Sequence, residues 1–239
     1  MSKKLGHGKC VHCLEYVKVR NYDHVLPVSW YPDTTPNNLE KWKVPSCIKC
    51  NREYGRLEED LLVKLSFCVD PNIDGSSGIY EKALRSINPK YGKNNKDKKA
   101  RQNKQNRILQ DMHYFEELPK DGIFPGFERN HIIGLDGNLP PAIQLPARDL
   151  KRLTKKIVKG ISFVSNELYI DDVYDIEMHV LNDLGAQPFI DIINKHGEVL
   201  DKGPGIIIRR AISHEDPICG VYAIEIWEQF KIYASVTRE

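Results

Sequence analysis

Along the first part of the chain, the spacing of hydrophobic positions changes from a period of two to a period near four. Residues 14–24 and 39–46 carry β-forming side chains in rough alternation, which predicts two strands separated by a proline- and asparagine-rich loop. From Ile48 to about Leu65 the apolar residues recur at steps of three and four, which predicts a helix. This β, β, α order gives way to a connector over residues 66–78, rich in Gly, Ser, Pro and Asp.

The rest of the chain alternates between helical, polar and β-type patterns. Residues 89–107 are rich in lysine and asparagine, which indicates a mobile loop or linker that either orders on a polyanion or remains a solvated tether. Residues 119–148 are rich in proline and glycine and predict only short strands and turns, with His131 and Asp136 as a polar loop pair. Helices are predicted at 79–88, 101–118, 150–164 and 173–184, and strands at 189–193, 198–200, 205–213 and 219–236.

Together these elements predict an α+β protein in three parts. Residues 1–70 form a ββα module, and residues 71–118 form a helical and basic linker region. Residues 119–239 form a small α+β domain of unassigned role, whose antiparallel sheet carries the helix that starts near residue 149. No internal repeat, P-loop or dinucleotide-binding glycine pattern is present in the sequence.

Composition and charge describe an ordinary globular protein with one unusual basic segment. The chain is 41% hydrophobic and 28% charged, and its net charge is only +2. No apolar run approaches the roughly eighteen residues of a membrane span, and the first nine residues lack the apolar core of a signal peptide. We therefore expect a cytoplasmic protein without a membrane partner. The basic residues gather between 90 and 107, as expected of a surface for nucleic acid.

Two Cys-x-x-Cys pairs flank the predicted strands, Cys10 with Cys13 and Cys47 with Cys50. Each such turn can aim two sulfurs at one point, so two turns can build a closed tetrahedral site of the kind that holds structural zinc. Two disulfides or a redox pair are the alternatives. A reducing compartment disfavours disulfides, and a redox motif is normally single and set in a βαβ pattern. The sequence therefore predicts a structural Zn²⁺.

The other candidate ligands near the pairs are His7 and His12, which could replace a cysteine, although the symmetric spacing favours four thiolates. The remaining cysteines, Cys68 and Cys219, lie in apolar contexts and are expected to be buried free thiols.

Between and beside the cysteine pairs, the segments DHVLP (23–27), NL (38–39) and PSCIKCN (45–51) follow one another in a specific order. This pattern resembles the HNH (ββα-metal) endonucleases, in the subgroup braced by four zinc-binding cysteines. The resemblance covers about residues 10–67, a quarter of the chain, and implies an N-terminal zinc-bound ββα-metal fold.

The resemblance also implies a set of site residues. Asp23 and Asn51 would hold a catalytic divalent cation, His24 would be the general base, and Asn38 would brace the loop through hydrogen bonds to its backbone. Asn37 could take the bracing role instead. Because carboxylate and amide oxygens are hard ligands, the catalytic ion would be Mg²⁺ or Mn²⁺.

The residue types fit phosphodiester hydrolysis on chemical grounds as well. An imidazole with an ordinary pKa near 6.5 can accept a proton from water at neutral pH. Basic side chains at a helix start can hold phosphates, because the helix N-terminus itself favours anions. The candidates for contact with nucleic acid are Lys49, Arg52, Arg56, Lys98, Lys99 and Arg101.

The predicted function is that of a metal-dependent endonuclease acting on DNA, in phage defence, restriction or a mobile element. Two alternatives remain open: a zinc-stabilised nucleic-acid-binding protein without catalysis, and an RNase on the same scaffold. RNA is not separated from DNA by these residues, and a homodimer or a regulatory protein partner is compatible with the downstream elements.

Overall fold

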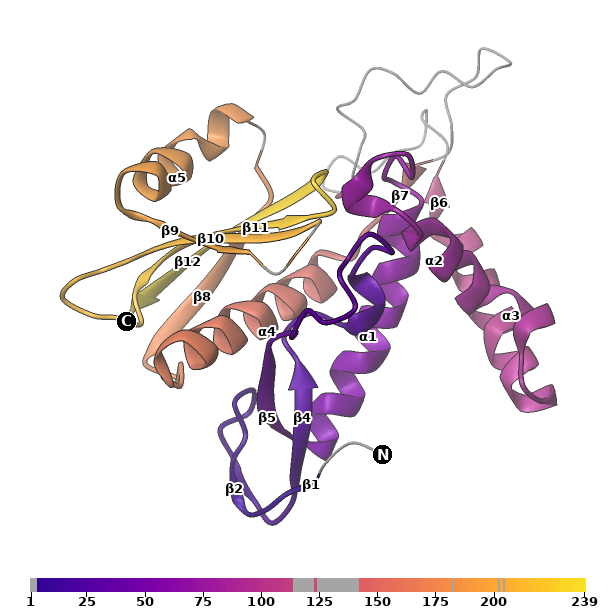
Figure 1. Ribbon diagram of the computed structural model, residues 1–239, viewed down its shortest axis with the longest axis horizontal. Coiled ribbons are helices and arrows are strands. Elements are labelled where there is room, and N and C mark those ends of the chain that lie inside the picture. Colours follow the sequence, from indigo (N-terminus) through magenta and orange to yellow (C-terminus); the bar gives the residue numbers. More distant parts are fainter. Residues whose placement is uncertain (1–3, 114–122, 124–141, 182, 202, 204) are drawn as a thin grey trace.

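The computed structural model describes residues 4–113, 123, 142–181, 183–201, 203 and 205–239. Its elements fall into a ββα part with further helices and a β-rich part, with one long helix between them (Figure 1). The first half contains β1 (Lys4–Leu5), β2 (Gly8–Lys9), β3 (Tyr16–Val17), β4 (Arg20–His24), η1 (Val28–Trp30), β5 (Lys43–Cys47), α1 (Ile48–Ser66), η2 (Asp74–Ser76), α2 (Ile79–Ile87), η3 (Pro89–Tyr91), α3 (Asn95–Gln110) and β6 (Met112–His113). The second half contains β7 (Ala142–Ile143), α4 (Ala147–Asn166), β8 (Tyr174–His179), α5 (Asp183–His196), β9 (Glu198–Asp201), β10 (Ile206–Ile212), β11 (Gly220–Ile226) and β12 (Phe230–Arg238).

The N-terminal part has the ββα order that the sequence predicts. Strand β4 lies between β1 and β5 in an antiparallel sheet, and Asp23 faces Val44 in the register of β4 with β5. Helix α1 follows β5 directly. Cys47 is its N-cap residue, and the Cys47 sulfur accepts a hydrogen bond from the backbone N–H of Cys50. The cysteine spacing thus fixes where the helix begins.

The lysine- and asparagine-rich segment is not a mobile linker, because most of it is helix α3. The Asn94 side chain caps the helix by accepting a hydrogen bond from the backbone N–H of Asp97, and Asp97 pairs with Arg101 one turn later. Lys104 and Ile108, four residues apart, are the positions that α3 buries. The sequence predicts this helix only from residue 101, because its first turns have a low apolar content and begin at a side-chain cap.

Helix α4 covers one face of a five-stranded antiparallel sheet of order β8-β12-β11-β10-β9. Tyr222, Ile224 and Ile226 alternate along β11 and bury their side chains on this face. Helix α5 covers the opposite face, where Phe189 contacts the Tyr233 ring at a centroid distance of 5.5 Å. The helix predicted at 150–164 and the strands predicted at 198–200 and 205–213 are confirmed as α4, β9 and β10. The β segment predicted at 219–236 is also confirmed, but as two paired strands, β11 and β12, joined by a turn.

Two predictions in this part are wrong. The helix predicted at 173–184 is strand β8 as far as His179, and Leu184 already belongs to α5. The spacing of four between Ile176 and Val180 suits one face of a strand as well as one face of a helix. The strand predicted at 189–193 lies within α5 despite Pro188, and its apolar residues have helical spacing. The helix predicted at 101–118 is confirmed as far as Gln110 but is wrong beyond it, because Met112–His113 form strand β6. Residues 114–118, and most of the turns predicted at 119–148 with His131 and Asp136, lie outside the described residues.

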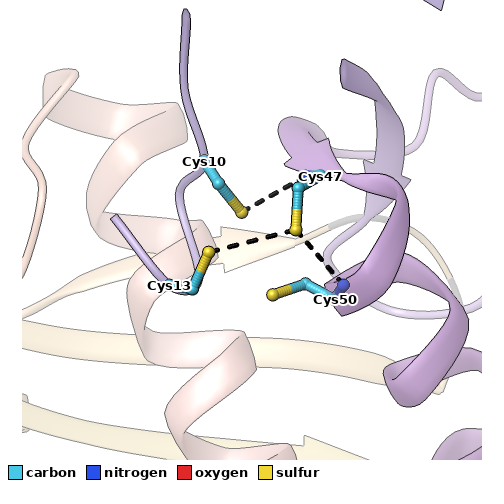
Figure 2. A group of neighbouring side chains, drawn as sticks. All are labelled: Cys10, Cys13, Cys47 and Cys50. Atoms are coloured by element: carbon cyan, nitrogen blue, oxygen red, sulfur yellow. Dashed lines mark hydrogen bonds between the residues drawn. The ribbon is translucent and has the colours of Figure 1, made fainter. Parts of the chain in front are cut away.

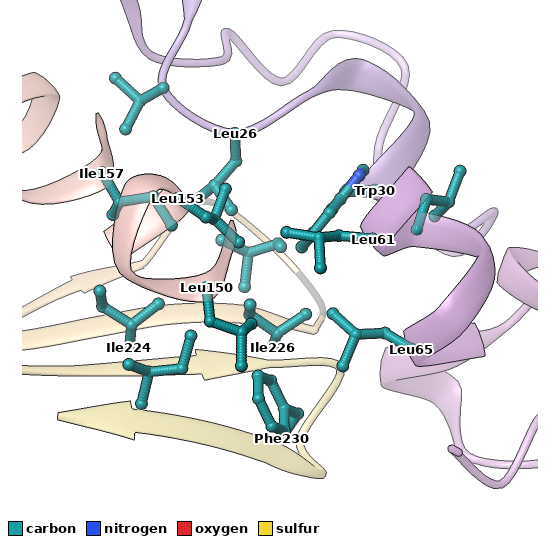
Figure 3. Close-up of a cluster of buried hydrophobic side chains, with 14 of the residues drawn as sticks. Leu26, Trp30, Leu61, Leu65, Leu150, Leu153, Ile157, Ile224, Ile226 and Phe230 are labelled. Carbon is teal, nitrogen blue, oxygen red and sulfur yellow. The ribbon is translucent and has the colours of Figure 1, made fainter. Parts of the chain in front are cut away.

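One buried hydrophobic cluster joins the two parts (Figure 3). The β11–β12 hairpin brings Trp227, fully buried and at a positive φ of 54°, against Trp30 at a ring-centroid distance of 5.4 Å. The Trp227 indole N–H donates to the Trp30 carbonyl oxygen at 2.6 Å. The ββα module and the sheet therefore share a core across the predicted boundaries at 70 and 118. Within the described residues, no helix has the length and apolarity needed to cross a membrane.

Candidate metal centre and the ββα crease

The two Cys-x-x-Cys pairs form one cluster of four sulfurs (Figure 2). All four Sγ atoms lie within 4.8 Å of one another, and the Cys13 and Cys47 sulfurs are 3.9 Å apart. A tetrahedral zinc with Zn–S bonds of about 2.3 Å separates its sulfurs by about 3.8 Å. Four thiolates at this spacing therefore fit a structural Zn²⁺, and no other group of three or more His, Cys, Asp or Glu ligands occurs in the described part of the chain.

Backbone hydrogen bonds place the first pair beside the second. A tight turn that includes Leu14 at a positive φ of 65° follows Cys10, and the Leu14 N–H donates to the Cys10 carbonyl at 3.0 Å. The backbone N–H of Cys47 donates to the Cys10 sulfur at 3.3 Å. The bond from Cys47 N–H favours negative charge on the Cys10 sulfur, as metal binding requires.

The thiols of the cluster interact strongly with one another. A hydrogen bond from the Cys50 thiol lowers the pKa of Cys10 to about 3, and the same bond raises the pKa of Cys50. One negative charge is therefore already favoured among the four sulfurs. Zinc binding would release the remaining thiol protons. Cys68 and Cys219 lie outside this cluster as free, half-buried cysteines.

The candidate catalytic residues of the N-terminal motif lie on two facing elements, β4 and α1. Asp23 and His24 end β4, and Asn51 lies in the first turns of α1. We call the space between β4 and α1 the ββα crease. The Asn51 side-chain amide donates to the Tyr22 carbonyl at 3.2 Å and to the Asn21 side-chain oxygen at 3.3 Å. Asn51 is thus held against the strand immediately before Asp23.

Asp23 is buried in the crease and already paired with cationic and donor groups. Its carboxylate accepts a hydrogen bond from His12 Nε2 at 2.9 Å and lies 3.3 Å from Lys156 Nζ. Its side chain is 9% exposed, and that of Lys156 is 0% exposed. The Asp23 oxygens are both engaged within the protein, whereas Asn51 uses only its amide N–H groups in its contacts with β4. In this arrangement Asp23 does not fit as a ligand of the divalent cation that the family resemblance implies.

Lys156 reaches the crease from α4, and Glu58 completes its environment. The ammonium donates to the His24 carbonyl oxygen at 2.6 Å and to the Glu58 carboxylate, and it lies 5.6 Å from the centroid of the Tyr54 ring. Burial raises the pKa of Glu58 to about 7, with the Lys156 charge opposing the increase. Lys156 therefore has oxygen partners on three residues, Asp23, His24 and Glu58, and its side chain has no exposure to solvent.

His24 is the candidate base and is only half-buried. Burial is the largest cause of its lowered pKa, and the positive charge of Lys43 is the next. The imidazole is therefore neutral at neutral pH, the form that can accept a proton. Lys43 is exposed at the start of β5 and faces His24 in the strand register.

The remaining predicted residues occupy separate surfaces. Asn37 and Asn38 are both exposed, and neither side chain has a hydrogen bond within the described residues, so the bracing role stays a prediction. Lys49, Arg52 and Arg56 are exposed on α1. Lys98 and Lys99 are exposed on α3, which extends away from β4 and β5 in Figure 1, whereas the Arg101 guanidinium is engaged by Asp97 and by the Arg85 carbonyl.

Sequence reasoning missed His12, Glu58 and Lys156 as members of the crease. Lys156 is one of several basic residues of α4, and such residues usually form a solvated helix face. It is fully buried instead, because the acidic partners come from strand β4 and helix α1, more than ninety positions earlier. His12 sits within the first cysteine pair and was considered as a zinc ligand, but its Nε2 binds Asp23.

Comparisons with protein-family models, with curated proteins and with solved structures find no match for this chain. The HNH resemblance therefore rests on the motif residues and on the ββα order.

Proposed function

We propose that this chain is a zinc-braced ββα endonuclease that hydrolyses phosphodiester bonds in DNA. The observation that carries the proposal is the four-sulfur cluster, which lies at the junction of β5 and α1. A zinc ion there would hold the Cys10–Cys13 turn to the junction of β5 and α1, and β5 pairs with β4, the strand that ends in His24. This is the arrangement that a ββα nuclease needs at its phosphate site.

His24 is the proposed general base. Its neutral imidazole would accept a proton from water as the water oxygen forms a bond to phosphorus. The bond from phosphorus to the 3′-oxygen breaks, and that oxygen takes up a proton, which leaves a 5′-phosphate and a 3′-hydroxyl. Lys43 beside His24 supplies positive charge near the phosphate.

Basic side chains on α1 would hold the nucleic acid backbone. Lys49 lies in the first turn of α1, and Arg52 and Arg56 are exposed one and two turns further along the helix. Contacts of this kind are made to phosphate and carry no sequence information. Lys98 and Lys99 on α3 would make more distant contacts of the same kind, and RNA would meet the same charges.

Divalent Mg²⁺ or Mn²⁺ would supply charge neutralisation at the phosphate when bound. Because Asp23 is paired with His12 and Lys156, the proposal assigns no step to an ion held by Asp23 and Asn51.

Plasmid cleavage by the purified zinc-loaded protein tests the proposal, with EDTA, Mg²⁺ or Mn²⁺ in separate reactions. We expect nicking or linearisation by the wild type, and a loss of about 10²-fold or more in His24→Ala, the usual contribution of a general base. Zinc content and DNA affinity should be unchanged in the variant. Equal cleavage by wild type and His24→Ala would remove His24 from the mechanism.

A second candidate function is a zinc-stabilised nucleic-acid-binding module without catalysis. The pairing of Asp23 with a buried lysine favours it, since a nuclease of this family would keep that carboxylate available. Tight binding to DNA or RNA with no cleavage under any metal condition would select this function over the first.

A further inference from the structure

The ββα crease contains a cation supplied by the chain itself. Lys156 Nζ lies 3.3 and 3.4 Å from the two oxygens of Asp23 and 2.6 Å from the His24 carbonyl oxygen. The same ammonium contacts the Glu58 carboxylate on α1. The positive charge of Lys156 is thus shared by Asp23 and His24, which end β4, and by Glu58 on α1.

The helix that carries Lys156 is held in place on both sides of the lysine. Leu153 and Ile157 are fully buried in the core that α4 shares with the sheet. One turn later, a Cβ on Gly160 would lie 2.8 Å from a Val25 methyl group, so only glycine allows α4 to approach the segment after His24 this closely. These contacts fix the part of α4 from which Lys156 reaches the crease.

We propose that Lys156 is the resident cation of the ββα crease, so that Asp23 is the partner of an internal ammonium and not a ligand of a divalent metal ion. The lysine acts as a positioning residue. It neutralises Asp23 and fixes the backbone of His24 from the C-terminal half of the chain. A divalent ion on Asp23 would lie beside the ammonium and be repelled by it. This inference concerns the cation alone and does not depend on hydrolysis.

Mn²⁺ binding to the full-length zinc-loaded protein tests the inference, with free Mn²⁺ measured by electron paramagnetic resonance. Asp23→Asn should bind Mn²⁺ as the wild type does, because Asp23 is not a ligand. Lys156→Met alone would leave two buried carboxylates uncompensated, so it is combined with Glu58→Gln to keep the charge balanced. The double variant should gain a Mn²⁺ site at least about tenfold tighter than any in the wild type, because Asp23 then becomes an available hard ligand.

Adding Asp23→Asn to the double variant should abolish the new site. Lys155→Met is the matched control, since Lys155 lies on the same helix and pairs with Asp175 outside the crease; it should gain no site. Weaker Mn²⁺ binding in Asp23→Asn than in the wild type would overturn the inference, and that arm does not require the double variant to fold. A folded double variant without a new site would overturn it equally. Plasmid cleavage plays no part in either result, so failure here is distinguishable from failure of the proposed nuclease.

Discussion

Among single residues, the buried charges of the crease have the largest energetic consequences. Asp23, Glu58 and Lys156 are all buried, and an ionised group removed from water is costly unless it is paired. The pairing is uneven. Two carboxylates share one lysine, and the pKa of Glu58 is raised to about 7 while Asp23 keeps two partners. Near neutral pH, the proton on Glu58 therefore decides the net charge of the network.

The raised pKa of Glu58 predicts that this residue makes the protein less stable as the pH rises. In the folded protein the pKa of Glu58 is about 7, above its ordinary value of 4.5. The contribution of Glu58 to the free energy of unfolding is therefore complete below pH 4.5 and is lost as the pH rises through 7. The free energy of unfolding should fall by up to about 3 kcal/mol over this interval through Glu58. Urea unfolding of wild type and Glu58→Gln at pH 5.5, 6.5, 7.5 and 8.5 measures it.

Zinc binding by the four cysteines has the opposite dependence on pH, because thiolates form as pH rises. For this reason the informative quantity is the difference in the free energy of unfolding between wild type and Glu58→Gln, because zinc binding contributes equally to both proteins. That difference should move in favour of the variant as pH rises. A constant difference across the four pH values would show that Glu58 titrates normally.

At the scale of elements, the sequence predicts those whose patterns are local. The ββα order, α1, α2, α4 and the last three strands follow from periodicity and from the cysteine spacing. Helix α3 follows only from residue 101 onward, because its first turns are almost without apolar residues and begin at the Asn94 cap. Lys104 then binds the Glu59 carbonyl on α1. The four-sulfur cluster could be predicted from its spacing alone. The Asp23–Lys156 pair could not, because nothing local distinguishes Lys156 from the other basic residues of its helix.

The cluster predicts that zinc stabilises the junction of β5 and α1. Cys47 is both a candidate ligand and the N-cap of α1, so Cys47→Ser should remove bound zinc and destabilise the N-terminal elements. Structural zinc sites bind with apparent free energies on the order of 10 kcal/mol, so the thermal midpoint should fall strongly. Zinc content by mass spectrometry and thermal melting by circular dichroism provide the measurement.

Cys219→Ser is the matched control, because Cys219 is a free cysteine outside the cluster. It should retain one zinc per chain and the wild-type melting temperature. A Cys47→Ser protein with full zinc content would exclude Cys47 from the site.

For the whole molecule, the contacts between the two parts argue against independent domains. The Trp30–Trp227 pair and the Lys156 network both join the ββα module to elements beyond residue 146. Trp227 lies in the turn between β11 and β12, where two successive non-glycine residues, Trp227 and Glu228, have positive φ. Such a backbone is strained for bulky residues, and the buried indole offsets that strain.

This shared core predicts a single cooperative unfolding transition for the whole chain. Trp227→Ala should lower the free energy of unfolding by about 3–5 kcal/mol, the usual cost of deleting a buried aromatic side chain. Because the cavity lies between the two parts, zinc release and loss of the sheet should shift together to lower denaturant concentration. A chromogenic zinc chelator and far-ultraviolet circular dichroism, recorded in one guanidinium titration, follow the two events.

Val199→Ala, at a 61% exposed position of β9, serves as the control and should leave both midpoints unchanged. Separation of the two midpoints in the wild type would mean that the ββα module unfolds by itself, and the contacts through Trp227 and Lys156 would then be too weak to couple it to the sheet.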